Sequence, residues 1–446
     1  MRLSIHSRVS AGVFLCVLAA GIPAGLRRSL ADGPKPFPIW DERAAFPAAK
    51  DLAVVDGAAD VVVHRGDSEW SFLHDNAVVW HGRELLAAWY NCPSGEMVGA
   101  SAIRGRRSKD AGRTWGPVEV IAADRDRKGI LYVPVSLLSH GGVLHAFVSN
   151  MTGPDLVTRC EAFVHDPRAG AWVSRGFIAG PFLPNCAPLK MDDGNFIMAG
   201  RVSDRPGAKP ETPAVAISEG DKLTSPWTVI RLGDRKLPPF PETTLWTQGR
   251  SLTAIARGGH VFASDDFGRT WTGPARANLP MESSKLYAGT LSTHQRYLIW
   301  NVPQPPVRRS LLVIAVSRPG ERTLSAAWKI RDGHSDKLDA GPEWSYPCAV
   351  EHEGRLYVIY TSQKRNSVMT VLPVKSLAHP LPAVSGRGMA VPLERGAQAF
   401  LAYEDGQAAA VARPVGKGMV YTFGFEPLLQ ATLNDRSRSV KGSRVL

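Results

Sequence analysis

Polar, charged and aromatic side chains recur at the ends of apolar segments along this sequence, where folding alone does not require them. Carboxylates among them can exchange protons with a substrate, and a tyrosine hydroxyl can attack one when a base accepts its proton. Arginines suit planar anions. The residues are His74, Asp75, Asn76, Tyr132, Asn185, Arg201, Glu242, Arg257, Lys285, Asn301 and Tyr346. Together they predict a site for a ligand with polar or acidic groups.

Each of these residues lies at an end of, or one or two positions before, one of six copies of a repeated unit. Each copy is an apolar strand, a short turn with Gly or polar residues, and a second apolar strand. The copies span residues 76–90, 133–150, 186–201, 243–257, 285–301 and 347–361. A repeat of roughly fifty residues is typical of propeller blades, each of which is a four-stranded sheet. We therefore predict an all-β fold, a six-bladed β-propeller, with residues 380–425 as a possible seventh blade.

The order of the strands explains why the polar residues would converge. In each copy the first strand starts, and the second strand ends, at the same end of the hairpin. In a propeller these are the inner strands, which line the central channel. The residues that open the first strand and close the second would therefore surround one mouth of that channel.

Two further stretches share the pattern S-x-D-x-G-R-T-W, at residues 108–115 and 264–271. The Asp can accept hydrogen bonds from the backbone of a tight turn, and the Gly supplies a positive φ. The Trp is large enough to pack between neighbouring sheets. The two copies follow the first and the fourth predicted hairpins, where the outer hairpin of a blade belongs.

This motif resembles the Asp-box of the sialidase-like BNR-repeat β-propellers, which are related to exo-alpha-sialidases. The resemblance covers about residues 60–378. In that family three arginines hold a substrate carboxylate, a tyrosine attacks with the help of a glutamate, and a first-blade Asp serves as acid and base. By resemblance, Tyr346 is the nucleophile, Arg257 is the second arginine, and Arg308 or Arg309 is the third.

The sequence departs from the family pattern in three places. The Phe-Arg-Ile-Pro motif that carries the first family arginine has Leu73 in the arginine position, and Leu73 cannot bind a carboxylate. Counting from the neighbouring turn places the family glutamate near Trp246 rather than at Glu242. Glu96 stands in the first-blade loop where the family has an Asp. We nevertheless expect the Tyr346 hydroxyl to point toward Glu242.

Three functions remain open from the sequence. The first is an exported glycoside hydrolase on an acidic or neutral glycan, with Tyr346, Glu242 and Glu96 as catalytic residues. Its substrate-binding residues are Arg257, Arg308, Arg201, His74, Asp75, Asn76 and Asn301. The second is a glycan-binding propeller without catalysis, and the third is a polysaccharide lyase that uses Tyr346 or His74 as a base on a uronic acid.

Each of these residues also has a structural alternative. Tyr346 would then pack only against the proline after it, and Arg257 and Arg308 would form ion pairs that stabilise the fold. Glu242 would cap a neighbouring backbone group, and His74 would be a hydrogen-bonded core histidine.

The N-terminus reads as an export signal, with Arg2 and Arg8, an apolar run at 11–20, and a cleavage candidate at 29–31. Cleavage would lower the formal net charge from +12 to +8. The positive charge that remains favours acidic partners. The alternative is an uncleaved anchor. We expect a secreted or periplasmic protein with no stable membrane span after cleavage. Nucleic acid is not an expected partner, because no basic stretch interleaves with aromatics.

Cysteine usage and domain boundaries complete the expectations. Four cysteines would follow the signal, and they allow three pairings, none of which the spacing selects. No Cys-x-x-Cys or acidic cluster specifies a metal, so no metal or other cofactor is expected. The expected division is a signal peptide at 1–31, a surface segment at 32–59, the propeller at 60–378, and a β-hairpin appendage with a basic tail at 379–446.

Overall fold

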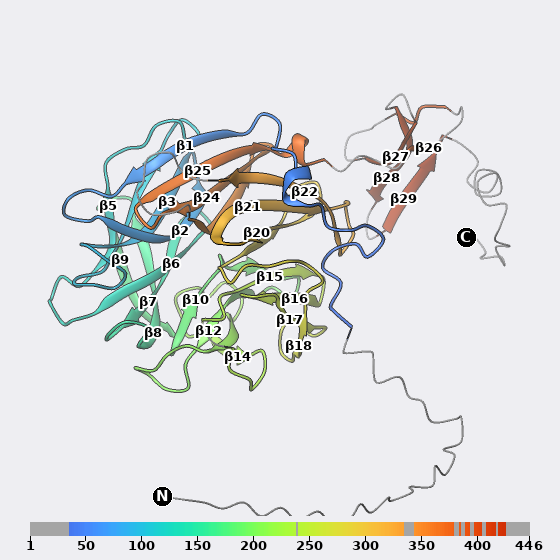
Figure 1. Cartoon of the computed structure of the whole chain (residues 1–446). Helices are drawn as coiled ribbons and strands as arrows, with labels where there is room; N and C mark the ends of the chain where they lie inside the picture. Colours follow the sequence, from blue (N-terminus) through green and yellow to red (C-terminus); the bar gives the residue numbers. More distant parts are fainter. Residues whose placement is uncertain are drawn as a thin grey trace, which may run out of the picture. The chain divides into compact units, whose positions relative to one another are not determined.

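The computed structural model describes residues 35–237, 240–333, 343–378, 383–384, 389–392, 397–403, 407–415 and 418–424. Helix in these residues is limited to two short 3-10 turns, η1 (Ala49–Asp51) and η2 (Val374–Leu377). Almost all other regular structure is β-strand, which confirms the predicted all-β class (Figure 1). The chain divides into two units, Met1–Lys35 and Pro36–Leu446. The predicted signal peptide and the basic tail lie outside the described residues.

Antiparallel sheets follow one another along the second unit, with their main strands in sequence order. The first contains β2 (Phe72–His81), β3 (Glu84–Cys92), β4 (Ala102–Ser108) and β5 (Glu119–Ala123). The second contains β6 (Leu131–His140), β7 (Val143–Met151), β8 (Val157–Asp166) and β9 (Ala171–Ala179). The third contains β10 (Phe182–Pro184), β12 (Phe196–Val202), β13 (Thr212–Ile217) and β14 (Thr228–Arg231), and β11 (Leu189–Lys190) also pairs with β12.

Three more sheets continue the series. The fourth contains β15 (Thr243–Gln248), β16 (Ser251–Ala256), β17 (His260–Ser264) and β18 (Thr272–Arg276). The fifth contains β19 (Tyr287–Thr290), β20 (Arg296–Gln304), β21 (Val307–Ser317) and β22 (Leu324–Asp332). The sixth contains β23 (Trp344–His352), β24 (Arg355–Ser362), β25 (Asn366–Pro373) and β1 (Ala59–Arg65). Five of the six predicted hairpins are present as the first two strands of their sheets. In the third sheet the first strand is β10, and the strand predicted at 186–190 is reduced to the two residues of β11.

The first strands connect successive sheets. Strand β2 contacts β6, β6 contacts β10, β12 contacts β15, β15 contacts β19, β19 contacts β23, and β23 contacts β2. The N-terminal β1 is hydrogen-bonded to β25, so the sixth sheet joins strands from both ends of the chain segment 59–373; Figure 1 shows the blue β1 beside the orange β25. The inner strands therefore share one interior, where the sequence predicts the site.

The two S-x-D-x-G-R-T-W turns fold alike. In each, the serine hydroxyl accepts a hydrogen bond from the glycine N–H, at 2.8 Å for Gly112 and 2.9 Å for Gly268. The aspartate accepts one from the threonine N–H four residues later, at 2.8 and 2.9 Å. Both glycines have a positive φ, 85° and 78°. The turns join the third strand of a sheet to the fourth, as the sequence predicts, and both tryptophans pack against the core.

The segment before β1 does more than cross the surface. Short parallel bridges join Phe37 to Ala277, Trp40 to Leu324 and Val54 to Lys329. Ile39, Trp40 and Leu52 are buried in a core cluster with residues of the fourth and fifth sheets. This segment is therefore anchored by apolar burial, which its Pro- and charge-rich composition did not predict.

A separate sheet follows the sixth. It contains β26 (Ala383–Val384), β27 (Gln398–Tyr403), β28 (Ala408–Val415) and β29 (Gly418–Phe423), in that order. Strand β26 is parallel to β27, whereas the other pairs are antiparallel. Strands β27 and β28 pair as the hairpin predicted in this region.

Candidate active site

A cavity of about 310 Å³ lies at the ends of the inner strands, and its walls come from the first, second, third and sixth sheets and from the segment before β15. Its lining residues are His74, Asp75, Tyr90, Glu96, Met97, Val133, Pro134, Met151, Pro154, Asp155, Arg201, Phe240, Glu242 and Tyr346. Six of them are predicted site residues, from segments as far apart in sequence as β2 and β23. The predicted convergence at one end of the hairpins therefore holds for this group.

Tyr346 and Glu242 form the central contact. The Tyr346 hydroxyl donates a 2.6 Å hydrogen bond to Oε1 of Glu242, which confirms the predicted orientation. Glu242 is 2% exposed, and Nη1 of Arg257 donates to both its oxygens at 3.1 and 3.2 Å. Burial, together with the charge of Glu242, raises the pKa of Tyr346 well above its ordinary value of 10. The phenol therefore needs a base in contact to become a nucleophile, and Glu242 occupies that position.

Arg257 contacts Glu242 and is itself held by a further hydrogen bond. Its Nε donates to the Ser283 hydroxyl at 3.0 Å, and its side chain is 9% exposed. Burial acts to lower the pKa of Arg257, but the charges of Glu242 and Tyr346 outweigh burial and raise it. The guanidinium therefore remains charged and fixes the carboxylate that faces the tyrosine.

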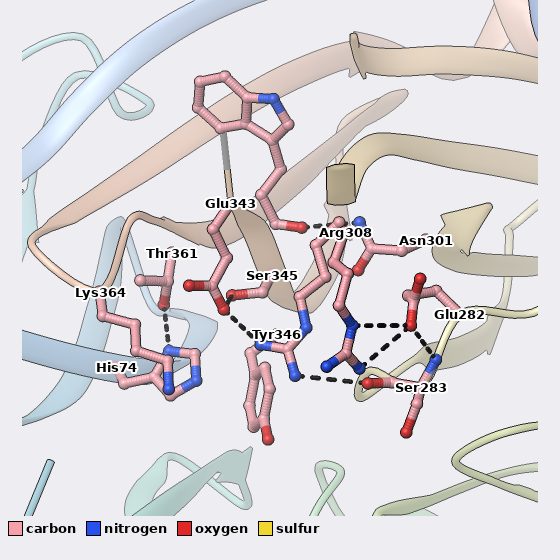
Figure 2. A network of polar contacts seen from close by, with 12 residues as sticks. His74, Glu282, Ser283, Asn301, Arg308, Glu343, Ser345, Tyr346, Thr361 and Lys364 are labelled. Atoms are coloured by element: carbon pink, nitrogen blue, oxygen red, sulfur yellow. Dashed lines mark hydrogen bonds and ion pairs between the residues drawn. The ribbon is translucent and has the colours of Figure 1, made fainter. Parts of the chain in front are cut away.

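His74 packs against Tyr346, with ring centroids 4.0 Å apart (Figure 2). Its Nδ1 lies 3.1 Å from the Thr361 hydroxyl, while its buried Nε2 has no hydrogen-bond partner in the described part of the chain. Burial, assisted by the charges of Lys364 and Arg309, lowers the pKa of His74 well below 6.5. The imidazole is therefore neutral at neutral pH.

Asp75 and Lys285 form a buried ion pair at the cavity wall. Burial raises the pKa of Asp75, although the charge of Lys285 and its hydrogen bond act in the opposite direction. The Lys285 Nζ also lies 5.8 Å from the Tyr346 ring centroid. The pair thus joins the first and fifth sheets next to the tyrosine.

The backbone around the cavity is irregular. Five lining residues other than glycine have a positive φ: Asp75, Met97, Asp155, Phe240 and Tyr346, with values from 54° to 60°. The pairing of β2 with β3 changes register at Asp75, and the pairing of β23 with β24 changes register at Tyr346. The pairing of β6 with β7 changes register beside Pro134. Such bulges re-aim side chains, and strained backbone of this kind concentrates at functional sites.

The two arginines at 308 and 309 have different surroundings. Arg309 forms an ion pair with Glu343, and its guanidinium carbon lies 5.6 Å from the Tyr346 ring centroid. Arg308 turns to Glu282 at 3.2 Å, with a side chain 65% exposed (Figure 2). Of the two candidates for the third arginine, the structure brings Arg309 to the tyrosine, and Arg309 has a positive φ of 56°.

Two predicted binding residues serve the fold and do not line the cavity. Asn76 donates to the Thr361 hydroxyl at 2.8 Å and accepts from Ser367 at 2.7 Å. Asn301 donates to the Trp344 carbonyl at 2.8 Å (Figure 2). Both side chains are buried and satisfy neighbouring strands.

Glu96 lies at the cavity as predicted, where it accepts hydrogen bonds from Tyr90 at 3.1 Å and Lys364 at 2.7 Å. The sequence missed a second acid, Asp155, in the loop after β7. Burial raises the pKa of Asp155, and the charge of Arg201 partly offsets this. Its Gly-Pro-Asp setting reads as an ordinary turn, so no sequence signal marked it as a site residue.

Two positions at which the sequence departs from the sialidase-like pattern, Leu73 and Trp246, are buried in the structure. Leu73 has no exposed surface and lies in the main core cluster, away from the cavity lining. Trp246 is also buried, and its indole N–H donates to the carbonyls of Gly289 and Tyr297 at 3.0 Å. Glu242, and not a residue near Trp246, therefore contacts the tyrosine.

Residues 83–358 match the BNR repeat-like domain. The chain belongs to this family. A comparison with curated protein sequences found no match. Among solved structures, a protein of unknown function from Dyadobacter fermentans is similar, with 15% identity and a TM-score of 0.56 over 71% of this chain and 99% of that one.

Two sialidases are also similar in structure. The Hadza microbial sialidase Hz136 has 16% identity and a TM-score of 0.56 over 70% of this chain and 68% of its own. Trypanosoma rangeli sialidase, solved as a covalent intermediate with 2,3-difluorosialic acid, has 14% identity and a TM-score of 0.54 over 73% of this chain. This chain covers 60% of the trypanosomal protein. At these identities the likeness shows the sialidase-like β-propeller fold alone.

Other features bear on the remaining expectations. Cys92, Cys160, Cys186 and Cys348 are buried free thiols, so none of the three possible pairings is formed. In the described ranges, no helix has the length and hydrophobicity of a membrane span. Within the same ranges, no three His, Cys, Asp or Glu residues are grouped to hold a metal ion.

Proposed function

We propose that this protein is an exported, sialidase-like glycoside hydrolase whose nucleophile is Tyr346. The observation that carries the proposal is the 2.6 Å hydrogen bond from the Tyr346 hydroxyl to Glu242 at the wall of a cavity. A buried phenol in contact with a carboxylate has the base that it needs for attack. The fold of the two similar sialidases supports a glycan as the ligand.

The proposed reaction has two steps. As the Tyr346 oxygen bonds to the anomeric carbon, its proton passes to Glu242, and the bond to the leaving group breaks. An acid at the cavity protonates the departing oxygen. A water then attacks the glycosyl-tyrosine, gives a proton to the same residue that acted as acid, and the phenolate recovers its proton from Glu242. Arg257 holds Glu242 in position throughout.

Glu96 and Asp155 are the two candidates for the acid. Glu96 was the sequence prediction, but Lys364 binds it at 2.7 Å. Asp155 has a raised pKa and forms no ion pair with another described residue, which favours its protonated form at the start of the reaction. If Asp155 is the acid, loss of its proton causes the fall in rate at high pH. Asp155→Asn should then remove this high-pH decline from the pH–rate profile, whereas Glu96→Gln should leave it in place.

We further propose that the six sheets are the blades of one closed propeller, spanning about residues 60–378. The pairing of β1 with β25 and the contact of β23 with β2 support six blades over seven. Residues 379–446 would then be an appendage, and residues 1–31 a cleaved signal. Mass spectrometry of the mature N-terminus after expression would test the cleavage after Ala31.

A second candidate is a glycan-binding propeller without catalysis. Leu73, which stands in place of the first family arginine, lies in the core, and this favours the second candidate. The ion pair of Glu96 with Lys364 favours it as well. The third, a lyase, would use neutral His74 or Tyr346 as the base on a uronic acid. An unsaturated product that absorbs in the ultraviolet would identify the lyase.

The test compares wild type, Tyr346→Phe and Tyr360→Phe on a panel of fluorogenic glycosides of acidic and neutral sugars. Tyr360 is a matched control, because its buried hydroxyl bonds to Thr370 and lies outside the cavity lining. We expect Tyr346→Phe to lose at least about 10²-fold in turnover, with the melting temperature retained. Full turnover by this variant removes Tyr346 from the mechanism, and binding without turnover by wild type favours the second candidate.

A further inference from the structure

The cations around the cavity are mostly neutralised. Four of them contact a carboxylate, and the pairs are Arg257 with Glu242, Lys285 with Asp75, Arg309 with Glu343, and Lys364 with Glu96. Two of these four are the arginines nearest Tyr346. A ligand anion that approached them would compete with a carboxylate already in place.

Arg201 is different. It is 7% exposed, it lines the cavity, and it forms no ion pair within the described residues. Its Nε and Nη1 are buried and have no hydrogen-bond partner in those same parts of the chain. Its guanidinium carbon lies 4.9 Å from the centroid of the Phe240 ring, which also lines the cavity.

The local fold holds Arg201 in this place. It lies on β12, paired with Leu183 of β10 on one side and Pro213 of β13 on the other. The preceding residue is Gly200, where any Cβ would collide with the carbonyl oxygen of Leu183. The glycine therefore allows β10 and β12 to approach closely, and the arginine that follows is fixed between two strands at the cavity wall.

A buried guanidinium without acceptors is costly, because its N–H groups lose water and gain nothing in exchange. Phe240 offers its ring face but no hydrogen-bond acceptor. Asp155 is near enough for its charge to interact with Arg201, yet the two do not form an ion pair. These N–H groups therefore lack a partner within the described residues, and the cavity that Arg201 lines is the space beside it that a ligand can enter.

We propose that Arg201, backed by Phe240, is an anion subsite that binds a sugar-borne oxyanion, either the carboxylate of a uronic acid or a sulfate ester. The inference rests on the proposed function only in requiring that a glycan occupies the cavity. Arg201 comes from the third sheet, whereas Arg257 and Arg309 come from the fourth and fifth sheets beside Tyr346. The anion is therefore bound from a different sheet than the one that carries Tyr346, within the same cavity.

The experiment measures binding, so that it does not depend on turnover. The full chain carrying Tyr346→Phe is tested on a glycan array of uronate oligosaccharides, their carboxyl-reduced forms, sulfated neutral oligosaccharides and neutral oligosaccharides. The same array is read with Arg201→Gln added, and with Lys209→Gln added as the control. Lys209 is an exposed cation nearby that does not line the cavity.

Arg201→Gln should weaken binding of the acidic glycans at least about tenfold, as expected for lost charged hydrogen bonds, and leave neutral glycans unchanged. Lys209→Gln should bind as its parent does. Uronate binding that disappears on carboxyl reduction identifies the carboxylate, and binding of the sulfated forms alone identifies the sulfate ester. Equal acidic binding with and without Arg201, or no acidic binding at all, overturns the proposal.

Thermal unfolding separates this role from a structural one. Arg201→Met removes an unpaired buried charge, so its melting temperature should equal or exceed that of wild type. A clear loss of melting temperature would mean that Arg201 holds the fold and would overturn the subsite. If acidic binding depends on Arg201 but wild type turns over no glycan, the subsite stands and the hydrolase proposal fails.

Discussion

The repeated turns at 108–115 and 264–271 and the cavity-facing strand ends both place residues other than glycine at positive φ. In the turns these are Ala111 and Phe267, each followed by a glycine. The hydrogen bonds that hold the turns join residues two to four positions apart. At the cavity, the contacts of Asp75 and Tyr346 reach 210 and 104 residues along the chain.

The difference shows that a backbone with positive φ can be stabilised in two ways. A turn whose partners are a few residues away forms from its own sequence, because little chain entropy is lost in bringing the partners together. A strained residue in a cavity persists only where the assembled fold holds it. The turns are therefore modular, and the cavity depends on every sheet that contributes to it.

Glu242→Gln should give the largest effect on turnover, because Glu242 contacts both Tyr346 and Arg257. Turnover should fall by roughly 10²- to 10⁴-fold as the base is lost, and Arg257 would be left buried beside a neutral amide. Glu161→Gln is the control, since it breaks an ion pair with Arg159 outside the cavity lining. Equal rates for wild type and Glu242→Gln, measured well below the melting temperature, would contradict the proposed base.

The free energy of unfolding should depend on core residues and on turn residues in two different ranges of acidic pH. Burial lowers the pKa of His64 to about 4 from 6.5, so the unfolded chain binds more protons between these values. The free energy of unfolding should therefore fall as pH drops from 6.5 to 4. Hydrogen bonds lower the pKa values of Asp110 and Asp266 to about 2 from 3.8, and this stabilisation is lost as pH falls from 3.8 to 2.

Variants assign the two windows. In urea titrations from pH 7 to pH 2, His64→Gln should reduce the slope of the upper window alone, to which His260 also contributes. Asp266→Asn should reduce the slope of the lower window alone, to which Asp41 and Asp110 also contribute. The opposite assignment, or a single window that both variants flatten, would show that the turns and the core do not respond separately to protons.

The two turn glycines offer a smaller, paired test. An alanine at either position must adopt a left-handed backbone, which costs about 1–2 kcal/mol of unfolding free energy. At Gly268 the new Cβ would also lie 3.0 Å from Cδ1 of Ile197, whereas at Gly112 its nearest contact is 3.4 Å away. Gly268→Ala should therefore destabilise more than Gly112→Ala, with turnover per folded molecule unchanged in both. A loss of turnover would show that the turns and the cavity are coupled.

Arg308→Gln should give the smallest effect. Its exposed ion pair with Glu282 contributes about 0–1 kcal/mol to stability, and its side chain does not line the cavity. Arg309→Gln, next to Tyr346, should lower turnover more than Arg308→Gln does. The reverse order would return Arg308 to the role that the sequence assigned to it.

Much of the fold was accessible from the sequence because its signals are local. Alternating apolar strands, short turns and the S-x-D-x-G-R-T-W motif predicted the six hairpins and the position of both motif turns. The convergence of His74, Arg201, Glu242 and Tyr346 also followed, since hairpin direction fixes which strand ends meet. The anchored segment around Trp40 was missed, because its apolar residues are scattered among prolines and charges.

The sequence by itself determined the β-rich class and the repeated hairpins, and it led to the prediction that Tyr346 points toward Glu242. Only the tertiary structure decided that Arg309 rather than Arg308 faces the tyrosine, that Asn76 and Asn301 satisfy neighbouring strands, and that Asp155 joins the cavity. These outcomes depend on side-chain direction at bulges and on partners from 34 to 291 residues away along the chain. A one-residue change in backbone direction reverses a side chain, and residue type and spacing do not record it.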